Sequence, residues 1–161
     1  MRKKVVSLLL VACMTGGLLA GCSGAGGGGG SDSDGNIVIG AVYPMTGDLA
    51  DSGKTMQQGI DMAVEEINEE GGIDGREIEV IYGDSQGDSA KGMTEAERLI
   101  TQENVDMLIG CYQSGVTVTV AQNAEQYQVP MITANATSDE LTSNGYEYFF
   151  RLAPTNMMFV R

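Results

Sequence analysis

The stretch IGCYQSGVT, residues 109–117, gathers groups that could bind or transform a small molecule. It places the thiol of Cys111, the amide of Gln113 and the hydroxyl of Ser114 directly after an apolar run. A thiol or hydroxyl becomes a nucleophile when a base lies beside it. The chain contains no histidine, which excludes Ser-His-Asp and Cys-His catalysis and histidine-based metal sites within these residues. We therefore expect a binding protein and not an enzyme, with Cys111 packing at a strand end.

The N-terminal segment has the layout of an export signal. Residues 1–21 combine a basic start, a short apolar run and small residues before Cys22, which together are typical of a signal peptide. Leu19-Ala20-Gly21-Cys22 resembles the bacterial lipobox, in which the cysteine is diacylated and becomes the first residue of the mature protein. The alternative is an ordinary signal peptide cut nearby, which would release the protein from the membrane. Cleavage removes Cys13, and acylation of Cys22 would then leave Cys111 without an intramolecular disulfide partner.

Charge excludes one class of partner. Loss of residues 1–21 would remove three basic residues and no acidic one, so the formal net charge would move from −13 to −16. So acidic a surface repels phosphate backbones and anionic lipids. We expect no nucleic-acid binding, and we expect a lipid anchor at Cys22 to hold the protein at the membrane.

Residues 22–35 form a glycine- and serine-rich tether, and the folded domain is expected to begin at residue 36. Asp32, Asp34 and Asn36 resemble the start of a calcium loop, but Tyr43 occupies the position where such a loop needs an acid. We expect neither a metal nor a cofactor.

Apolar runs alternate with amphipathic stretches along residues 36–161. Runs of strand length are followed by segments with helical spacing, and this order predicts an α/β fold with a Rossmann-like parallel sheet flanked by helices. The expected strands are 37–43, 78–82, 105–109, 130–133 and 148–152, the expected helices are 53–69, 89–102 and 114–127, and a further helix is expected to begin at 154–155.

The segment Val116–Val120 alternates with period two, which by local pattern alone favours a strand. A parallel neighbour at 130–133 requires a crossover, usually helical, in the residues between. We therefore predict a helix over 114–127, with Val116, Val120, Ala121 and Ala124 on its apolar side. Likewise, Met56, Ile60, Ala63, Val64 and Ile67 are expected to face inward from the first helix, and Met93, Ala96, Leu99 and Ile100 from the second.

A ligand site is expected beyond the carboxyl ends of the strands, where the strand order reverses. With the order 2-1-3-4-5, loops 43–53, 111–115 and 134–138 meet there. Lys54, just inside the following helix, is the one basic residue near these loops, so hydroxyls, amides and backbone N–H groups would bind the ligand. Such residues are also common as helix caps and turn residues. The candidate site residues are Ser52, Tyr112, Gln113, Ser114, Gly115, Asn135 and Thr137.

Several stretches carry a family likeness. They are TGDLADSGKTMQQGIDMAVEEINEEGGIDGREIEVIYGDSQGD, VDMLIGCYQSGVT, VPMITANATSDELT and YEYFFRLAPT. They resemble the substrate-binding lipoproteins of ABC importers, specifically the branched-chain amino-acid binding group. The resemblance implies the periplasmic-binding-protein type 1 fold, in which two lobes close on an amino acid. Residues 36–161 would then be an incomplete N-terminal ligand-binding lobe.

The resemblance also implies roles for single residues. Ser114 would bind the ligand carboxylate, Asn135 would offer a backbone carbonyl to the ammonium group, and Thr137 would complete that side, while the second lobe would supply an acid. Some members carry a tyrosine where this chain has Ser52. Others have a disulfide where it has Gln86 and Gln113.

The function expected on this basis is that of an extracytoplasmic receptor, lipid-anchored to the bacterial cell membrane. It would capture a branched-chain or related amino acid and deliver it to an ABC permease served by ATPase subunits. The alternative is a ligand-sensing ectodomain of a signalling system on the same fold. Because half of the clamp would be missing, we expect these residues alone to bind amino acids weakly or not at all.

Overall fold

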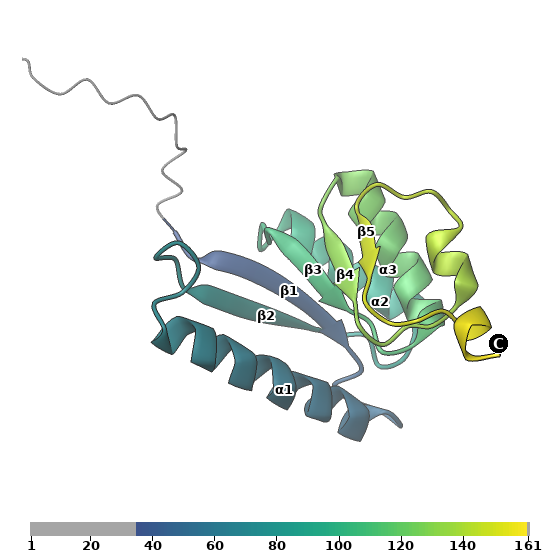
Figure 1. Cartoon of the computed structure of the whole chain (residues 1–161), viewed down its shortest axis with the longest axis horizontal. Helices are drawn as coiled ribbons and strands as arrows, with labels where there is room; N and C mark the ends of the chain where they lie inside the picture. Colours follow the sequence, from purple (N-terminus) through teal and green to yellow (C-terminus); the bar gives the residue numbers. More distant parts are fainter. Residues whose placement is uncertain (1–34, 161) are drawn as a thin grey trace, which may run out of the picture. The chain divides into compact units, whose positions relative to one another are not determined.

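Five parallel strands and three α-helices alternate along residues 35–160, which are the residues that the computed structural model describes (Figure 1). This confirms the predicted Rossmann-like α/β class. The sheet order is β2-β1-β3-β4-β5, with every neighbouring pair parallel. The strands are β1 (Ile37–Tyr43), β2 (Ile78–Asp84), β3 (Met107–Gly110), β4 (Met131–Thr133) and β5 (Phe149–Arg151); the helices are α1 (Ala50–Glu69), α2 (Ser89–Thr101) and α3 (Ser114–Tyr127).

The register brings three loops together at the carboxyl ends of the strands. Val42 of β1 pairs with Gly110 of β3, and Tyr43 pairs with Asp84 of β2. The loops that follow β1, β2 and β3 therefore leave the sheet side by side. Two short 3₁₀ helices, η1 (Asp139–Thr142) and η2 (Asn156–Phe159), follow β4 and β5, so a 3₁₀ turn stands where another helix was expected to begin.

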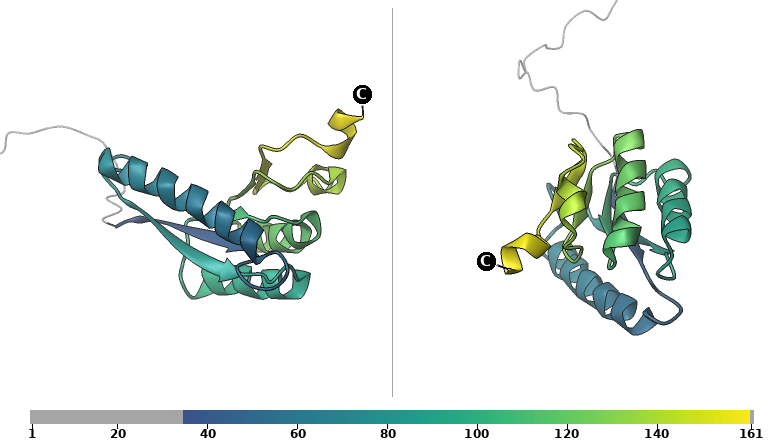
Figure 2. Two further views of the ribbon diagram at one scale, coloured as in Figure 1. Left: turned by 90° about the horizontal axis from the view of Figure 1, so that it is seen from below. Right: turned by 90° about the vertical axis from the view of Figure 1, so that its right-hand side faces the viewer.

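The two faces of the sheet are covered differently. Helices α2 and α3 pack on one face and enclose the hydrophobic core, whereas α1 lies on the other face beside β1 and β2 (Figures 1 and 2). Tyr82 of β2 ties α1 to the sheet by donating its phenolic hydrogen to Asp61, with 2.6 Å between the oxygens. The largest core side chains include Val42, Leu99, Leu108, Val116, Val120 and Met131.

Helix α3 forms where the local pattern favours a strand. Its four predicted inward residues, Val116, Val120, Ala121 and Ala124, are all buried. The helical period places them on one side, where they pack into the core beside α2. Gly92 of α2 permits this close approach, because a Cβ at that position would lie 2.5 Å from Val116 Cγ1. The crossover argument is confirmed.

Several boundaries and inward positions differ from expectation. Helix α1 begins at Ala50 rather than residue 53, because Ala50 is a strong helix former and Asp51 is favourable in a first turn. Met93 is 39% exposed instead of inward. Within the predicted stripe of α1, Ala63 is exposed and the other four residues are half-buried, since α1 lies against only part of the sheet.

The predicted signal peptide, the lipidation site Cys22 and residues 22–34 of the tether lie outside the described residues. Between residues 35 and 160, no helix is long and apolar enough to cross a membrane.

Candidate functional site

The N-terminus of α3 presents free backbone N–H donors at the carboxyl end of the sheet. Gln113 precedes the helix in an extended conformation, and its carbonyl accepts the first intrahelical bond, from the N–H of Thr117 at 2.9 Å. The N–H groups of Ser114, Gly115 and Val116 come before that bond and have no hydrogen-bond partner within residues 35–160. Unpaired N–H groups at a helix start attract anions, because the helix dipole adds partial positive charge there.

Ser114 is joined to the loop that follows β4. Its Oγ accepts a hydrogen bond from the N–H of Ser138, with 3.3 Å between the heavy atoms. The Ser138 carbonyl in turn accepts a hydrogen bond from Arg151 Nη1 at 2.6 Å, and Arg151 Nη2 donates to Thr142 Oγ1. The Ser114 hydroxyl proton remains available to a ligand. The predicted meeting of these two loops is thus seen directly.

Asp84 holds the loop that follows β1. Its Oδ1 accepts from the N–H groups of Met45 (2.8 Å), Thr46 (3.2 Å) and Gln86 (2.9 Å), and its Oδ2 accepts from Thr46 Oγ1 (2.6 Å). Partial burial acts to raise the pKa of this carboxyl, but the hydrogen bonds from Thr46, Gln86 and Met45 outweigh burial and lower it.

Asp84 and Arg151 do not appear among the candidate residues chosen from sequence. Both stand at the carboxyl ends of strands, which is the signal that could have revealed them.

The other predicted residues lie at the same end of the sheet and make fewer hydrogen bonds with one another. Ser52 lies in the first turn of α1 rather than in the preceding loop, because the helix starts early. Tyr112, Asn135 and Thr137 are half-buried, and Gly115 is exposed. The Thr137 carbonyl accepts a hydrogen bond from the N–H of Asn156 at 2.9 Å. Within the described chain, no hydrogen bond joins Ser52, Tyr112 or Asn135 to Ser114.

Gln113 turns its amide toward a different loop. Its Nε2 donates to the Gly87 carbonyl at 3.2 Å, in the loop between β2 and α2. Its Oε1 is fully enclosed and has no hydrogen-bond partner among the described residues.

Two ionisable groups in the core beneath the site are held in their neutral forms. Cys111 is 1% exposed, and burial raises the pKa of its thiol to about 12 despite a hydrogen bond with Thr117. Burial, together with the neighbouring Cys111, raises the pKa of Tyr43 to about 12. Neither group is ionised at neutral pH, so Cys111 has the character of a packing residue and lacks that of a nucleophile.

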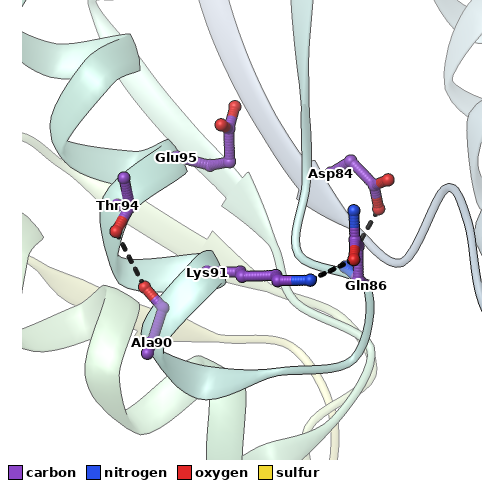
Figure 3. Close-up of a pocket in the computed structure, with 6 residues that line it drawn as sticks. All are labelled: Asp84, Gln86, Ala90, Lys91, Thr94 and Glu95. Atoms are coloured by element: carbon purple, nitrogen blue, oxygen red, sulfur yellow. Dashed lines mark hydrogen bonds between the residues drawn. The ribbon is translucent and has the colours of Figure 1, made fainter.

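A hollow of about 280 Å³ opens beside the start of α2, and none of the predicted site residues lines it (Figure 3). Its polar groups are already paired: Lys91 Nζ donates to Gln86 Oε1, Thr94 donates to the Ala90 carbonyl, and Glu95 pairs with Arg98 at 2.9 Å. Across the part of the chain that the structure describes, no three Cys, Asp or Glu side chains gather as a metal-binding group.

Comparison with known proteins identifies the family. The family model described as "Periplasmic binding protein" matches residues 36–160. A Leu/Ile/Val-binding protein homolog 7 from Brucella suis is 37% identical over 145 residues, covering 90% of this chain and 34% of the relative. The chain therefore spans about a third of the length of the curated relatives it matches.

Solved structures agree with this assignment. The branched-chain amino-acid transporter substrate-binding protein LivJ from Streptococcus pneumoniae, in complex with isoleucine, has a TM-score of 0.71 and 38% identity over 74% of this chain and 34% of its own. A solute-binding protein from R. palustris in complex with 4-hydroxybenzoate has a TM-score of 0.67 and 28% identity over 74% of this chain and 32% of its own. The chain belongs to the periplasmic binding protein family and carries the type 1 fold, and its relatives include Leu/Ile/Val-binding and branched-chain amino-acid transporter proteins.

Proposed function

We propose that this protein is the extracytoplasmic solute-binding component of an ABC importer and that it captures a branched-chain or related amino acid by its carboxylate. The observation that carries the proposal is the start of α3, where three N–H groups without partners in the described chain lie beside the Ser114 hydroxyl. The surrounding loops contain no histidine, lysine or arginine of their own, so backbone dipoles and hydroxyls would supply the attraction.

Relatives with different ligands support the choice of the carboxylate. Isoleucine and 4-hydroxybenzoate, the ligands named for two of the matched structures, differ in size, ring character and ammonium group, and both carry a carboxylate. A helix N-terminus suits that shared group. In this chain Ser114 would donate its hydroxyl to the carboxylate, while Asn135 and Thr137 would contact the ammonium side.

Capture would work by closure of two lobes, with the second lobe supplied by sequence beyond the matched third. Ligand contacts made only in the closed form would shift an open–closed equilibrium, and a permease with its ATPase subunits would receive the closed form. Diacylation of Cys22 would keep the protein at the outer face of the cell membrane. The protein would bind its ligand without transforming it.

Calorimetry on the full-length protein tests the carboxylate contact. We expect L-leucine or a close analogue to bind, and leucinamide, which lacks the carboxylate, to bind at least tenfold more weakly. Ser114→Ala should weaken leucine binding by about 10-fold or more, because a hydrogen bond to a charged group is worth about 1.5–3 kcal/mol. Ser143→Ala is the matched control, since Ser143 Oγ donates to the Glu140 carbonyl in an exposed turn outside the site.

Equal affinity for leucine and leucinamide would refute the carboxylate contact. A panel of amino acids and aromatic carboxylates identifies the ligand class. Incorporation of labelled palmitate, compared between the wild type and Cys22→Ser, tests the anchor separately.

A further inference from the structure

We propose that Gln113 is a positioning residue, whose side-chain amide fixes the start of α3, and with it Ser114, against the loop between β2 and α2. The ligand-binding consequence rests on the function proposed above, whereas the positioning itself does not. Gln113 makes this connection across 26 residues of sequence, from Nε2 to the Gly87 carbonyl.

Gln113 is joined to α3 by its backbone and to the neighbouring loop by its side chain. Its carbonyl accepts from both the N–H and the Oγ1 of Thr117, each at 2.9 Å. Its backbone thus forms the first turn of α3, and the next residue along is Ser114. A movement of the Gln113 side chain is therefore transmitted to Ser114 through a single peptide unit.

Gly87 is shaped to receive the amide. It has a φ of +73°, in the left-handed region that favours glycine, and a Cβ there would lie 3.1 Å from Gln113 Nε2 and 3.2 Å from Oε1. The amide thus lies where a side chain at residue 87 would be. Any larger residue at Gly87 would push the amide away and would be strained itself.

The unpartnered Oε1 indicates that the amide does more than stabilise the fold. Burying an acceptor without a donor costs free energy, which offsets what the bond from Nε2 contributes. An apolar side chain of the same shape would stabilise the fold equally well or better. What an apolar side chain cannot do is fix the loop by a directional bond.

Two further hydrogen bonds join α3 to α2. Together with the Gln113 bond they form a row, the α2–α3 seam, and Gln113 lies at one end of it. The Thr119 hydroxyl lies within hydrogen-bond distance of the Ser89 carbonyl (3.1 Å) and of the Val116 carbonyl in its own helix (2.9 Å), and Asn123 Nδ2 donates to the Met93 carbonyl at 2.8 Å. All three bonds run from side chains of α3 or its first flanking residue to backbone carbonyls of α2 or its preceding loop. Gln113 makes its bond beside the proposed binding site at the start of α3, and Asn123 makes an equivalent bond far along α3.

This seam supplies a control that separates positioning from stability. Gln113→Met keeps the length of the side chain and removes the donor. Asn123→Leu removes the distant bond of the same seam, and Gln122→Met makes the same chemical change at an exposed position of α3. Gly87→Ala displaces the amide from the opposite side.

The experiment uses the full-length protein with two readouts. The first is hydrogen exchange of the Ser138 amide, which reports the position of Ser114 because that N–H donates to Ser114 Oγ. The second is the Kd for L-leucine. For Gln113→Met and Gly87→Ala we expect Ser138 exchange at least fivefold faster and leucine bound about tenfold more weakly. For Asn123→Leu we expect a lower melting temperature, with Ser138 exchange and Kd within twofold of wild type, as for Gln122→Met.

Unchanged Ser138 exchange in Gln113→Met would overturn the proposal. So would an equal loss of affinity in Asn123→Leu, because Gln113 would then act only through general stability. If the wild type does not bind leucine, the proposed ligand is wrong, and the exchange comparison still decides the positioning role.

Discussion

Replacement of Asp84 tests whether one carboxylate organises the loops that follow β1 and β2, at the carboxyl end of the sheet. The carboxylate accepts four hydrogen bonds, three from backbone N–H groups to Oδ1 and one from Thr46 Oγ1 to Oδ2. Asp84→Ala removes all four. Asp84→Asn keeps Oδ1 as an acceptor, and its new amide can donate to Thr46 Oγ1, so it removes mainly the charge.

The expected loss follows from the number and kind of bonds. A typical hydrogen bond contributes about 1 kcal/mol net, and one to a charged group about 1.5–3 kcal/mol. The four bonds share one partly solvated acceptor and are not additive, so we expect Asp84→Ala to lower the free energy of unfolding by about 3 kcal/mol. Asp84→Asn should lower it by about 1 kcal/mol, the charge-assisted part.

The pH dependence gives a second signature. The pKa of Asp84 is lowered in the folded state, so its contribution is fully present above the unfolded pKa of about 3.9. That contribution is lost as pH falls below this value through the folded pKa. The stability difference between wild type and Asp84→Asn should therefore shrink as the pH is lowered from 5 to 3.

Urea denaturation followed by far-UV circular dichroism measures both effects. Two results would contradict the reasoning. The first is an Asp84→Ala variant whose free energy of unfolding is within about 0.5 kcal/mol of wild type, as for an ordinary surface substitution. The second is a difference in free energy of unfolding between wild type and Asp84→Asn that stays constant over this pH range.

Three further predictions concern the fold. Gly53→Ala places a Cβ 2.1 Å from the Pro44 carbonyl oxygen. Overpacking should cost about 3 kcal/mol, and the better helix propensity of alanine should return about 1 kcal/mol. Urea denaturation should therefore show a free energy of unfolding lower by about 2 kcal/mol. Gly59→Ala in the same helix has nothing within 4 Å and should raise stability by up to about 1 kcal/mol; a loss from both substitutions would show that the Pro44 contact is not the cause. Leu108→Ala, at a fully buried position, should cost about 2–5 kcal/mol, and a cost below about 1 kcal/mol would mean that this core site collapses freely. Cys111, with its thiol pKa raised to about 12 by burial, should resist iodoacetamide at pH 8 until urea unfolds the chain, as followed by peptide mass mapping; native-state labelling would contradict its burial.

The sheet and helices were predictable because their signals extend over many residues. Apolar runs of strand length separated by helical crossovers allow few arrangements other than a parallel sheet. That constraint also decided α3, where the alternation of Val116–Val120 favours the wrong element. Helix starts were less predictable: Ala50 and Asp51 extend α1 through a stretch expected to be loop, and Ser52 moves into the helix with them.

Contacts between loops were beyond the reach of local pattern. Asp84 reaches Thr46 because β1 and β2 pair with Tyr43 opposite Asp84, and a shift of register would separate them. Ser114 meets Ser138 across 24 residues for the same kind of reason. The sequence shows which polar residues follow each strand, and the register of the strands decides which of them meet.

The sequence by itself determined the fold class and which polar residues follow each strand. Its apolar runs and helical crossovers define the parallel sheet, and the stretches 43–53, 111–115 and 134–138 that follow the strands offer hydroxyls and amides but no histidine, lysine or arginine. Only the tertiary structure decided the direction of each side chain. Gln113 and Ser114 are neighbours in sequence, yet one bonds to the loop after β2 and the other to the loop after β4. The physical reason is that successive side chains at a helix start point in different directions. The contact that each side chain makes therefore depends on which loop the fold has placed in its path.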